Sequence, residues 1–317
     1  MRRWIWIAIA VVIGAAAIAA LGDVRQLAAR LHGFRWAAFV AALGLALGNY
    51  AIRFVRWTQY LGRQGVRVPV GDSALVFGAG LSLSITPGKL GELIKSYLLR
   101  ELHGAPATRT APIVVAERVT DLIALLVLAV AGAIAYGVAL GAALAAGALI
   151  ALGLVLLAWP RPTRALIDLA TRPERLARLR APLHDMYAGL ASLCRPATLA
   201  AATALAVPAW ACECVGFALI VNAFPGAHVD LGLAVAIYAG TTIAGALSFL
   251  PGGLGVTEGA MAMWLVRGAT RVDSSSAVDA TLLTRLATLW FAVGLGVVCL
   301  AAARRRVRAR AKGARAA

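Results

Sequence analysis

The stretches SITPGKLGE (residues 84–92) and SFLPGGLGVTE (residues 248–258) each interrupt an apolar run with Pro-Gly, add further glycine and end on a glutamate. A proline removes a backbone donor and ends the helix before it, and the glycines that follow let the chain turn. Inside a bilayer, backbone without regular hydrogen bonds persists only where it is buried in protein or lines a polar cavity. The two stretches therefore predict two broken helices, and they decide the fold.

The composition is that of a membrane protein. Of the 317 residues, 61% are hydrophobic and 14% are charged, and the mean hydropathy is +0.83, whereas soluble domains carry about 25% charged residues. We expect an all-α polytopic protein with one integral membrane domain at residues 1–303 and a basic cytoplasmic tail at 304–317. The net charge of +17 fits cytoplasmic loops rich in arginine, so the sequence argues against a nucleic-acid partner.

Six apolar runs are long enough to cross a bilayer as full transmembrane helices. They cover about residues 4–21, 36–52, 112–137, 139–158, 197–222 and 277–301. The interrupted elements at 72–99 and 231–267 lie between these spans. We expect both to be re-entrant hairpins, which enter the membrane and leave it on the same side.

The arginines favour re-entry over full crossing. With re-entrant hairpins, both termini and the arginine-rich loops 53–71 and 159–196 face the cytoplasm, as the positive-inside rule requires. Full crossing would force loop 159–196, with seven arginines, to the outside. Loop 222–230 carries no Arg or Lys and is expected outside. Arg53 and Arg56 are expected to reach the membrane interface from a helix end.

The two hairpins form an internal repeat. Residues 84–91 align with residues 248–255. Each break is followed by a glutamate and then an arginine: Glu92 and Arg118, and Glu258 and Arg285. Three full spans separate the hairpins, so they enter from opposite faces. This layout predicts an inverted repeat of about residues 34–139 and 197–301.

A helix that restarts at membrane depth directs unpaired N–H groups and a positive dipole end toward a cavity, which suits an anion such as a phosphate. Lys89 adds a positive charge in the first hairpin, and Gly253 stands at the matching position of the second. The first hairpin is therefore expected to hold a phosphate better. The alternative is that both breaks are kinks that aid close helix packing.

Several ionisable residues fall deep within the expected spans: Glu117, Arg118, Asp121, Glu213 and Arg285. Each would cost about 2.5–3.5 kcal/mol if it faced lipid, so we expect them to face one another or a wet cavity, with Asp121 paired to Arg285. The alternative is a purely structural cluster of salt bridges. The candidate residues for headgroup binding or a translocation path are Pro87, Gly88, Lys89, Gly91, Glu92, Glu117, Arg118, Asp121, Glu213, Pro251, Gly252, Gly253, Gly255, Glu258 and Arg285.

Three motifs in order, TPGKLGELIKSYLL (86–99), ERVTDLIALLVL (117–128) and LPGGLGVTEGA (250–260), resemble the lysylphosphatidylglycerol synthase transmembrane family, also called flippase-like. The resemblance covers about residues 34–300. It implies a lipid translocase or a related lipid-handling protein of the bacterial inner membrane. Stand-alone bacterial members of the family, some of them in hopanoid gene neighbourhoods, share this module without an enzyme. The soluble aminoacyl-transfer domain of the fused members is not expected here. By resemblance, the functional candidates are Lys89, Glu92, Glu117, Arg118, Asp121 and Glu258.

Three functions remain open from the sequence. The first is a translocase that moves a phospholipid or an isoprenoid or hopanoid-type lipid, with membrane lipids as partners and no cofactor. The second is an accessory subunit of a lipid-biosynthetic enzyme encoded nearby, and the third is a membrane enzyme with an atypical site. No GxSxG, HExxH, P-loop or dinucleotide fingerprint occurs. Cys212 and Cys214 flank Glu213, but no histidine joins them, so no metal site is expected.

Overall fold

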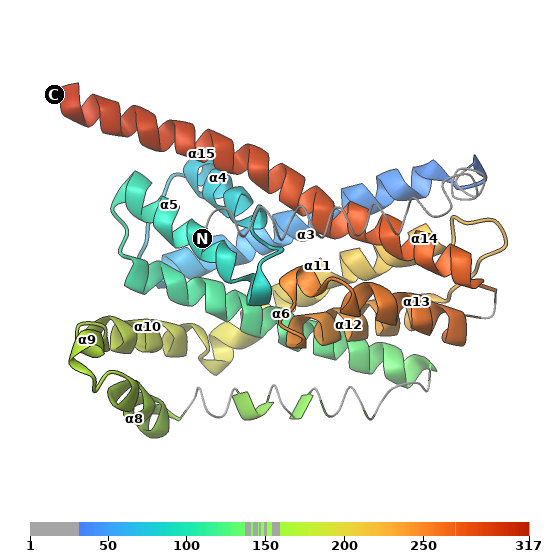
Figure 1. Cartoon of the computed structure of the whole chain (residues 1–317), viewed down its shortest axis with the longest axis horizontal. Helices are drawn as coiled ribbons and strands as arrows, with labels where there is room; N and C mark the ends of the chain where they lie inside the picture. The colour runs from blue at the N-terminus through green and yellow to red at the C-terminus, as the bar shows by residue number, and fades with distance from the viewer. Residues whose placement is uncertain are drawn as a thin grey trace.

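The structure, a computed structural model, describes residues 32–136, 159–269 and 271–316, with side chains to Arg310, and a few positions between 141 and 153 (Figure 1). These residues form helices joined by turns and short connections, and no strand occurs among them. The expectation of an all-α polytopic membrane fold is confirmed.

Four helices are long and apolar enough to cross a membrane. They are α3 (Trp36–Arg63), α6 (Ala107–Tyr136), α11 (Pro196–Val221) and a continuous helix over Ser274–Arg310. The last of these joins α14 (Ser274–Arg285), the π-helical turn η3 (Leu286–Trp290) and α15 (Phe291–Ala316). They correspond to four of the six expected spans. The expected span 4–21 and most of 139–158 lie outside the described residues.

The two interrupted elements are helical hairpins broken where the prolines and glycines predict. The first runs from α4 (Val70–Leu81) through the 3-10 turn η1 (Pro87–Leu93) into α5 (Ile94–His103). The second runs from α12 (Leu231–Leu247) through η2 (Pro251–Gly253) into α13 (Val256–Gly268). Within each hairpin the two arms pack against each other, and η1 packs against η2. Re-entry from opposite membrane faces stays a prediction.

The two repeats interlock. Helix α3 of the first packs along α11 of the second, and the closing helix of each repeat covers the other repeat's hairpin: α6 packs on α12, and α15 packs on α4. Two glycines allow these close contacts. A Cβ on Gly132 of α6 would lie 2.6 Å from the backbone nitrogen of Ala236, and one on Gly296 of α15 would overlap the backbone of Leu81 and Ser82. This reciprocal packing brings both breaks to the centre of the bundle.

The connection expected at residues 53–71 begins later than predicted. Helix α3 continues to Arg63, and Arg53 and Arg56 are 4% and 1% exposed. An apolar run ends at an arginine, but a helix does not have to end there if a carboxylate neutralises the charge inside the protein. These side chains therefore stay in the bundle instead of reaching the interface.

The expected loop 159–196 also contains regular structure. It forms α8 (Pro160–Ala170), α9 (Glu174–Ala177) and α10 (Arg180–Leu193). Pro160 is the first residue of α8, and Pro173 precedes α9, the positions at a helix start where proline fits best. Helix α10 packs against α6, so this segment forms part of the bundle at one end.

The expected tail at 304–317 begins as part of a helix. Helix α15 continues to Ala316, and its arginines contact the first hairpin. Arg306 pairs with Asp72, and Arg310 lies 3.1 Å from the same carboxylate and donates to the Leu102 carbonyl oxygen. His103 Nε2 also lies 3.0 Å from Asp72. These contacts fasten the end of α15 to both arms of the first hairpin.

Candidate functional site

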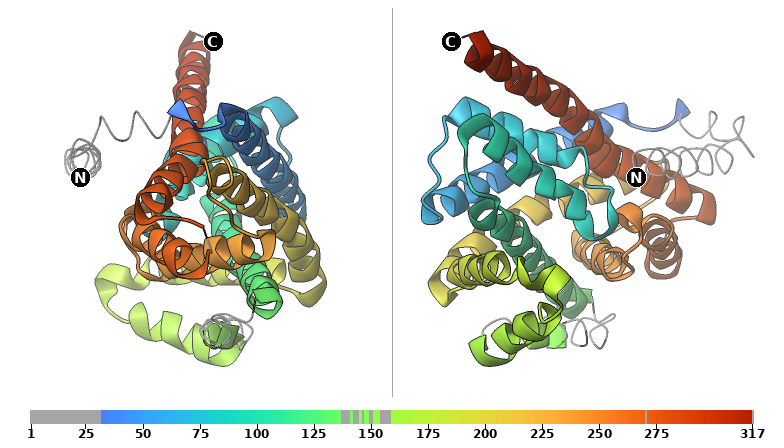
Figure 2. Two further views of the ribbon diagram at one scale, coloured as in Figure 1. Left: turned by 90° about the vertical axis from the view of Figure 1, so that its right-hand side faces the viewer. Right: turned by 60° about the vertical axis from the view of Figure 1, so that its left-hand side comes forward.

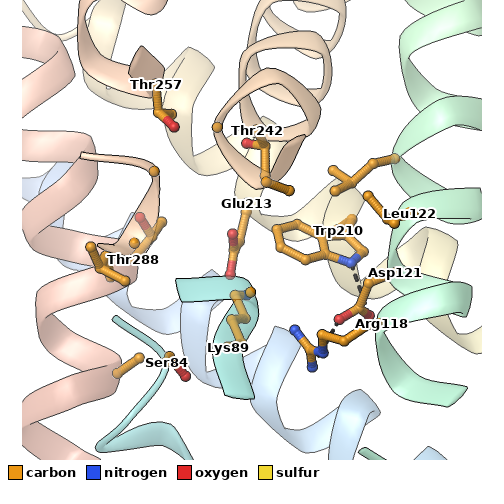
Figure 3. Close-up of a pocket in the computed structure, with 18 of the residues that line it drawn as sticks. Ser84, Lys89, Arg118, Asp121, Leu122, Trp210, Glu213, Thr242, Thr257 and Thr288 are labelled. Atoms are coloured by element: carbon orange, nitrogen blue, oxygen red, sulfur yellow. Dashed lines mark hydrogen bonds and ion pairs between the residues drawn. The ribbon is translucent and has the colours of Figure 1, made fainter. Parts of the chain in front are cut away.

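A cavity of about 290 Å³ lies where the two hairpin breaks meet. Both hairpins contribute to its wall, together with side chains from α3, α6, α11, α12 and α14. In Figure 3, Lys89 extends from the first break into this space, with Glu213 and Trp210 of α11 opposite and Arg118 and Asp121 of α6 to one side. The cavity therefore combines an apolar wall with several charges at the centre of the bundle.

Eight of the fifteen candidate residues line the cavity, and seven do not. The lining residues are Gly88, Lys89, Arg118, Asp121, Glu213, Gly252, Gly253 and Arg285. The others are Pro87, Gly91, Glu92, Glu117, Pro251, Gly255 and Glu258. The three glutamates among them are paired with cations of the bundle.

The breaks share an unusual backbone conformation. Gly88 and Lys89 have φ of 57° and 54°, and the matching Gly252 and Gly253 have 61° and 67°. This left-handed region costs an L-residue about 1–2 kcal/mol but costs glycine little. The second hairpin meets the demand with glycine, whereas the first keeps a lysine there. A lysine held in this conformation, with its side chain in the cavity, is a candidate binding residue.

Most backbone N–H groups of the breaks already have acceptors. Lys89 N donates to Thr86 O at 2.8 Å, and Gly91 N donates to the Thr86 hydroxyl at 2.7 Å. In the second hairpin, Gly253 N donates to Leu250 O at 3.0 Å. The expectation that these N–H groups face a ligand is therefore wrong at these positions. Side-chain cations supply the positive charge instead.

Each hairpin glutamate pairs with the arginine of its own repeat. Glu92 lies 3.4 Å from Arg118, and Glu258 lies 2.6 Å from Arg285. Arg285 also donates to the Gly252 carbonyl oxygen at 2.6 Å, so it holds the second break directly. The expected pairing of Asp121 with Arg285 is wrong, because both residues are bound to other partners.

Asp121 is the hub of a buried arginine cluster. Its carboxylate lies 2.8 Å from Arg56, 3.1 Å from Arg118 and 3.9 Å from Arg53. The Trp210 indole N–H donates to it at 3.2 Å. One carboxylate cannot satisfy three guanidinium groups. Arg53 Nε and Nη2, which are buried, have no hydrogen-bond partner within the described part of the chain.

Lys95 was not among the candidates, although it lies within the motif TPGKLGELIKSYLL (86–99). It is 1% exposed, and its ammonium lies 2.5 Å from Glu117 and 3.2 Å from Glu92. It also lies over the Trp57 ring, 4.6 Å from the centroid. Its place one turn after Glu92 on a helix could have indicated this pairing. Lys95 ties the first hairpin to α6 and does not line the cavity.

Two ionisable groups in the cavity wall lack a counter-ion. No carboxylate among residues 32–136 and 159–310 with described side chains lies within ion-pair distance of Lys89, which contacts the Trp210 ring at 5.4 Å. Glu213 is 7% exposed and accepts a hydrogen bond from Tyr238 at 2.6 Å, without a cation in ion-pair distance among the same residues. Figure 3 shows the two side chains pointing toward each other.

The charge beside the first hairpin is unbalanced. Four cations, Arg53, Arg56, Lys95 and Arg118, are grouped with three carboxylates, Glu92, Glu117 and Asp121. Lys89 adds a fifth cation and Glu213, in the wall of the same cavity, a fourth carboxylate, so one positive charge is left over. A buried excess of positive charge is costly unless an anion enters. This end of the cavity is therefore suited to an anionic group.

A family model described as the lysylphosphatidylglycerol synthase TM region matches residues 5–296. No curated protein matches the chain. The match spans most of the chain, including both hairpins and the cavity between them. With four apolar helices long enough to cross a bilayer, it identifies a membrane protein of a lipid-related family. The chain belongs to the lysylphosphatidylglycerol synthase TM region family.

Proposed function

We propose that the protein is a non-enzymatic lipid translocase of the bacterial inner membrane. In this proposal a phospholipid or a phosphate-bearing isoprenoid or hopanoid-type lipid moves between leaflets with its headgroup in the central cavity. The observation that carries it is the unpaired Lys89, held in a strained backbone conformation at the edge of a cavity with excess positive charge. Membrane lipids are the proposed partners.

The arginine at position 53 completes the proposed phosphate site. It lines the cavity, is 4% exposed and has two nitrogens without hydrogen-bond partners among the described residues. Arginine and lysine together suit a phosphate, because one offers a planar fork of donors and the other a mobile point charge. A phosphate between Lys89 and Arg53 would offset the positive charge that the four nearby carboxylates, Glu213 included, leave over.

The cavity size supports a headgroup and not a whole lipid. A volume of about 290 Å³ lies at the small end of ligand sites, so the acyl or prenyl chains would remain in the bilayer. The hairpin tips carry apolar side chains suited to contact them: Leu90 is 65% exposed and Phe249 is 71% exposed. Phe249 also lines the cavity, where it would separate the headgroup from the chains.

Proteoliposomes that contain only this protein test the proposal. A fluorescent phospholipid that redistributes between leaflets faster than in protein-free liposomes would support it. Lys89→Gln should slow redistribution by about ten- to a hundredfold, since a charged hydrogen bond contributes about 1.5–3 kcal/mol. Lys89→Arg keeps the charge and should retain most of the activity.

The accessory role is the competing outcome of the same assay. If wild-type protein redistributes no lipid alone but does so, or raises lipid modification, when an enzyme encoded nearby is added, the translocase proposal is wrong. Wild-type rates for both Lys89→Gln and Lys89→Arg would remove Lys89 from the mechanism.

A further inference from the structure

Helix α8 is strongly amphipathic and has no buried residue. Pro162, Leu166 and Leu169 follow the spacing of one helix face, and Arg161, Arg164 and Asp168 follow that of the opposite face. Leu166 is 64% exposed and Leu169 is 55% exposed, and Trp159 just before the helix is 56% exposed. The apolar face is thus open along the whole helix.

The side of α8 that the protein partly covers carries Thr163 and Ile167, and Asp168 beside it binds α10. Asp168 lies 3.0 Å from His184 and 3.6 Å from Arg180, both on α10. Its pKa lies below the usual value, chiefly because of the hydrogen bond with His184, so the carboxylate is charged at neutral pH. A helix in water would bury its apolar face and expose its polar one. The apolar face of α8, with Leu166 and Leu169, is instead exposed.

The position of α8 suits the surface of a bilayer. In Figures 1 and 2 it lies at the edge of the molecule beside α9 and α10, at the end of the bundle where α6 and α11 begin. Tryptophan is typical of the interface between lipid and water, and Trp159 stands at the start of the helix. Leu176 and Leu179, which follow α8, are 42% and 43% exposed.

The charge of this segment favours an anionic surface. Exposed arginines alternate with the apolar residues: Arg161, Arg164, Arg172, Arg175 and Arg178. The acidic residues of the segment are Asp168, Glu174 and Asp185, and Asp168 is already paired with α10. Arginines beside an apolar helix face attract anionic lipid headgroups and reach them with long side chains.

We propose that α8 is an interfacial helix whose apolar face enters the adjoining leaflet of the membrane that the protein spans, while the surrounding arginines bind anionic phospholipid headgroups. This peripheral lipid surface is separate from the central cavity and does not depend on the translocase proposal. A second copy of the chain and a partner protein are the other possible occupants of the apolar face, and the experiment below distinguishes them.

Spin labels on two sides of α8 test the proposal in full-length protein, in nanodiscs that contain phosphatidylglycerol. Leu166→Cys and Arg164→Cys are made in a background without the four native cysteines and labelled. Oxygen, which concentrates in lipid, should reach the label at 166 several-fold better than a water-soluble nickel chelate does. The label at 164 should show the opposite preference.

Two results would overturn the proposal. If the nickel chelate reaches the label at 166 as well as it reaches the label at 164, the apolar face of α8 is in water. A label at 166 that is immobilised and reached by neither reagent means that protein covers the face. Should the cysteine-free background not fold, brominated lipid gives a second measurement: it should quench the wild-type fluorescence more than that of Trp159→Phe.

Anionic lipid tests the arginines separately. In the protein labelled at position 166, the accessibility of the label to oxygen relative to the nickel chelate should rise when phosphatidylglycerol replaces a zwitterionic lipid. Each arginine near an anionic surface adds about fivefold to the attraction, so Arg161→Gln with Arg178→Gln should abolish most of this rise. The control variant, Arg304→Gln with Arg305→Gln, removes two exposed arginines from α15 and should leave this rise unchanged. A rise that is equal in both double variants would overturn headgroup binding by the α8 arginines.

Discussion

Lys89 combines a conformational cost with a position in the cavity wall. Its matching residue is Gly253, and both adopt a left-handed conformation. The same backbone geometry therefore occurs once with a side chain and once without. At this pair of positions the two hairpins differ by the lysine side chain, which places an ammonium group in the cavity wall of the first hairpin alone.

Replacing Lys89 should separate stability from function. Lys89→Gly relieves the strained φ and should raise the unfolding free energy by about 0.5–1 kcal/mol after the added freedom of the unfolded chain is subtracted. Lys89→Ala keeps the strain and should not stabilise. Both should lose lipid redistribution. Thermal unfolding in detergent and the proteoliposome assay measure the two effects, and a Lys89→Gly protein that is less stable than wild type would contradict the assignment of strain.

The ion pairs predict a specific pattern of coupling. Arg285→Gln and Glu258→Gln should be strongly non-additive, because either change alone leaves a partly buried partner unpaired. Arg285→Gln and Asp121→Asn should add, since these residues bind different partners. Asp121→Asn alone should cost about 3–5 kcal/mol, because it leaves Arg56 buried without a carboxylate. The unfolding free energies of the single and double variants measure whether the effects add. A non-additive effect of Asp121→Asn and Arg285→Gln would contradict the contacts described here.

At the scale of the element, the sequence predicts the breaks better than the ends of helices. Proline and glycine act on their own backbone, so both hairpin breaks follow from local pattern alone. The continuation of α3 past Arg53 depends on Asp121, which is 68 positions away in the numbering, and no local pattern reveals such a partner. The burial of Arg53 is unpredictable for the same reason, whereas the i,i+3 spacing of Glu92 and Lys95 is a local signal for the pairing of Lys95.

The repeat predicts that Glu92 and Arg118 occupy positions equivalent to Glu258 and Arg285, but it does not predict which glutamate pairs with which arginine. Both pairs were identified as matching positions, but symmetry alone does not say whether partners belong to one repeat or to two. The structure places both pairs within a repeat. Membrane depth correctly indicated that these charges face inward, because lipid offers them no counter-ion.

The hairpins predict the side on which each connecting segment lies. With re-entry, α8–α10 is cytoplasmic and segment 222–230 is external. In a cysteine-free background, an impermeant maleimide added to intact cells should label His228→Cys and leave Arg172→Cys unlabelled until the cells are opened. Both positions are exposed, so access to the side chain does not limit either reaction. Labelling of Arg172→Cys from outside would show that the hairpins cross the membrane.

At the scale of the whole molecule, reciprocal packing of the repeats depends on two glycines at matching places. Gly132→Ala would push α6 away from α12, and Gly296→Ala would push α15 away from α4. Each should cost about 1–3 kcal/mol, because the atoms in the way are backbone and cannot move aside. Gly294→Ala is the control on α15, since nothing lies within 4 Å of its added methyl group. Melting temperatures that fall equally for Gly294→Ala and Gly296→Ala would contradict this account of the interlock.

The helix over Ser274–Arg310 joins two distant places in the molecule. One end holds Arg285 beside the second break, and the other holds Arg306 against Asp72 of the first hairpin. The two arginines are separated by about 30 Å of helix at 1.5 Å per residue. The π turn at Leu286–Trp290 stands next to Arg285, where the backbone ladder is locally loosened. Because one continuous helix is bonded to both hairpins, a tilt of this helix at one hairpin would displace the other hairpin as well.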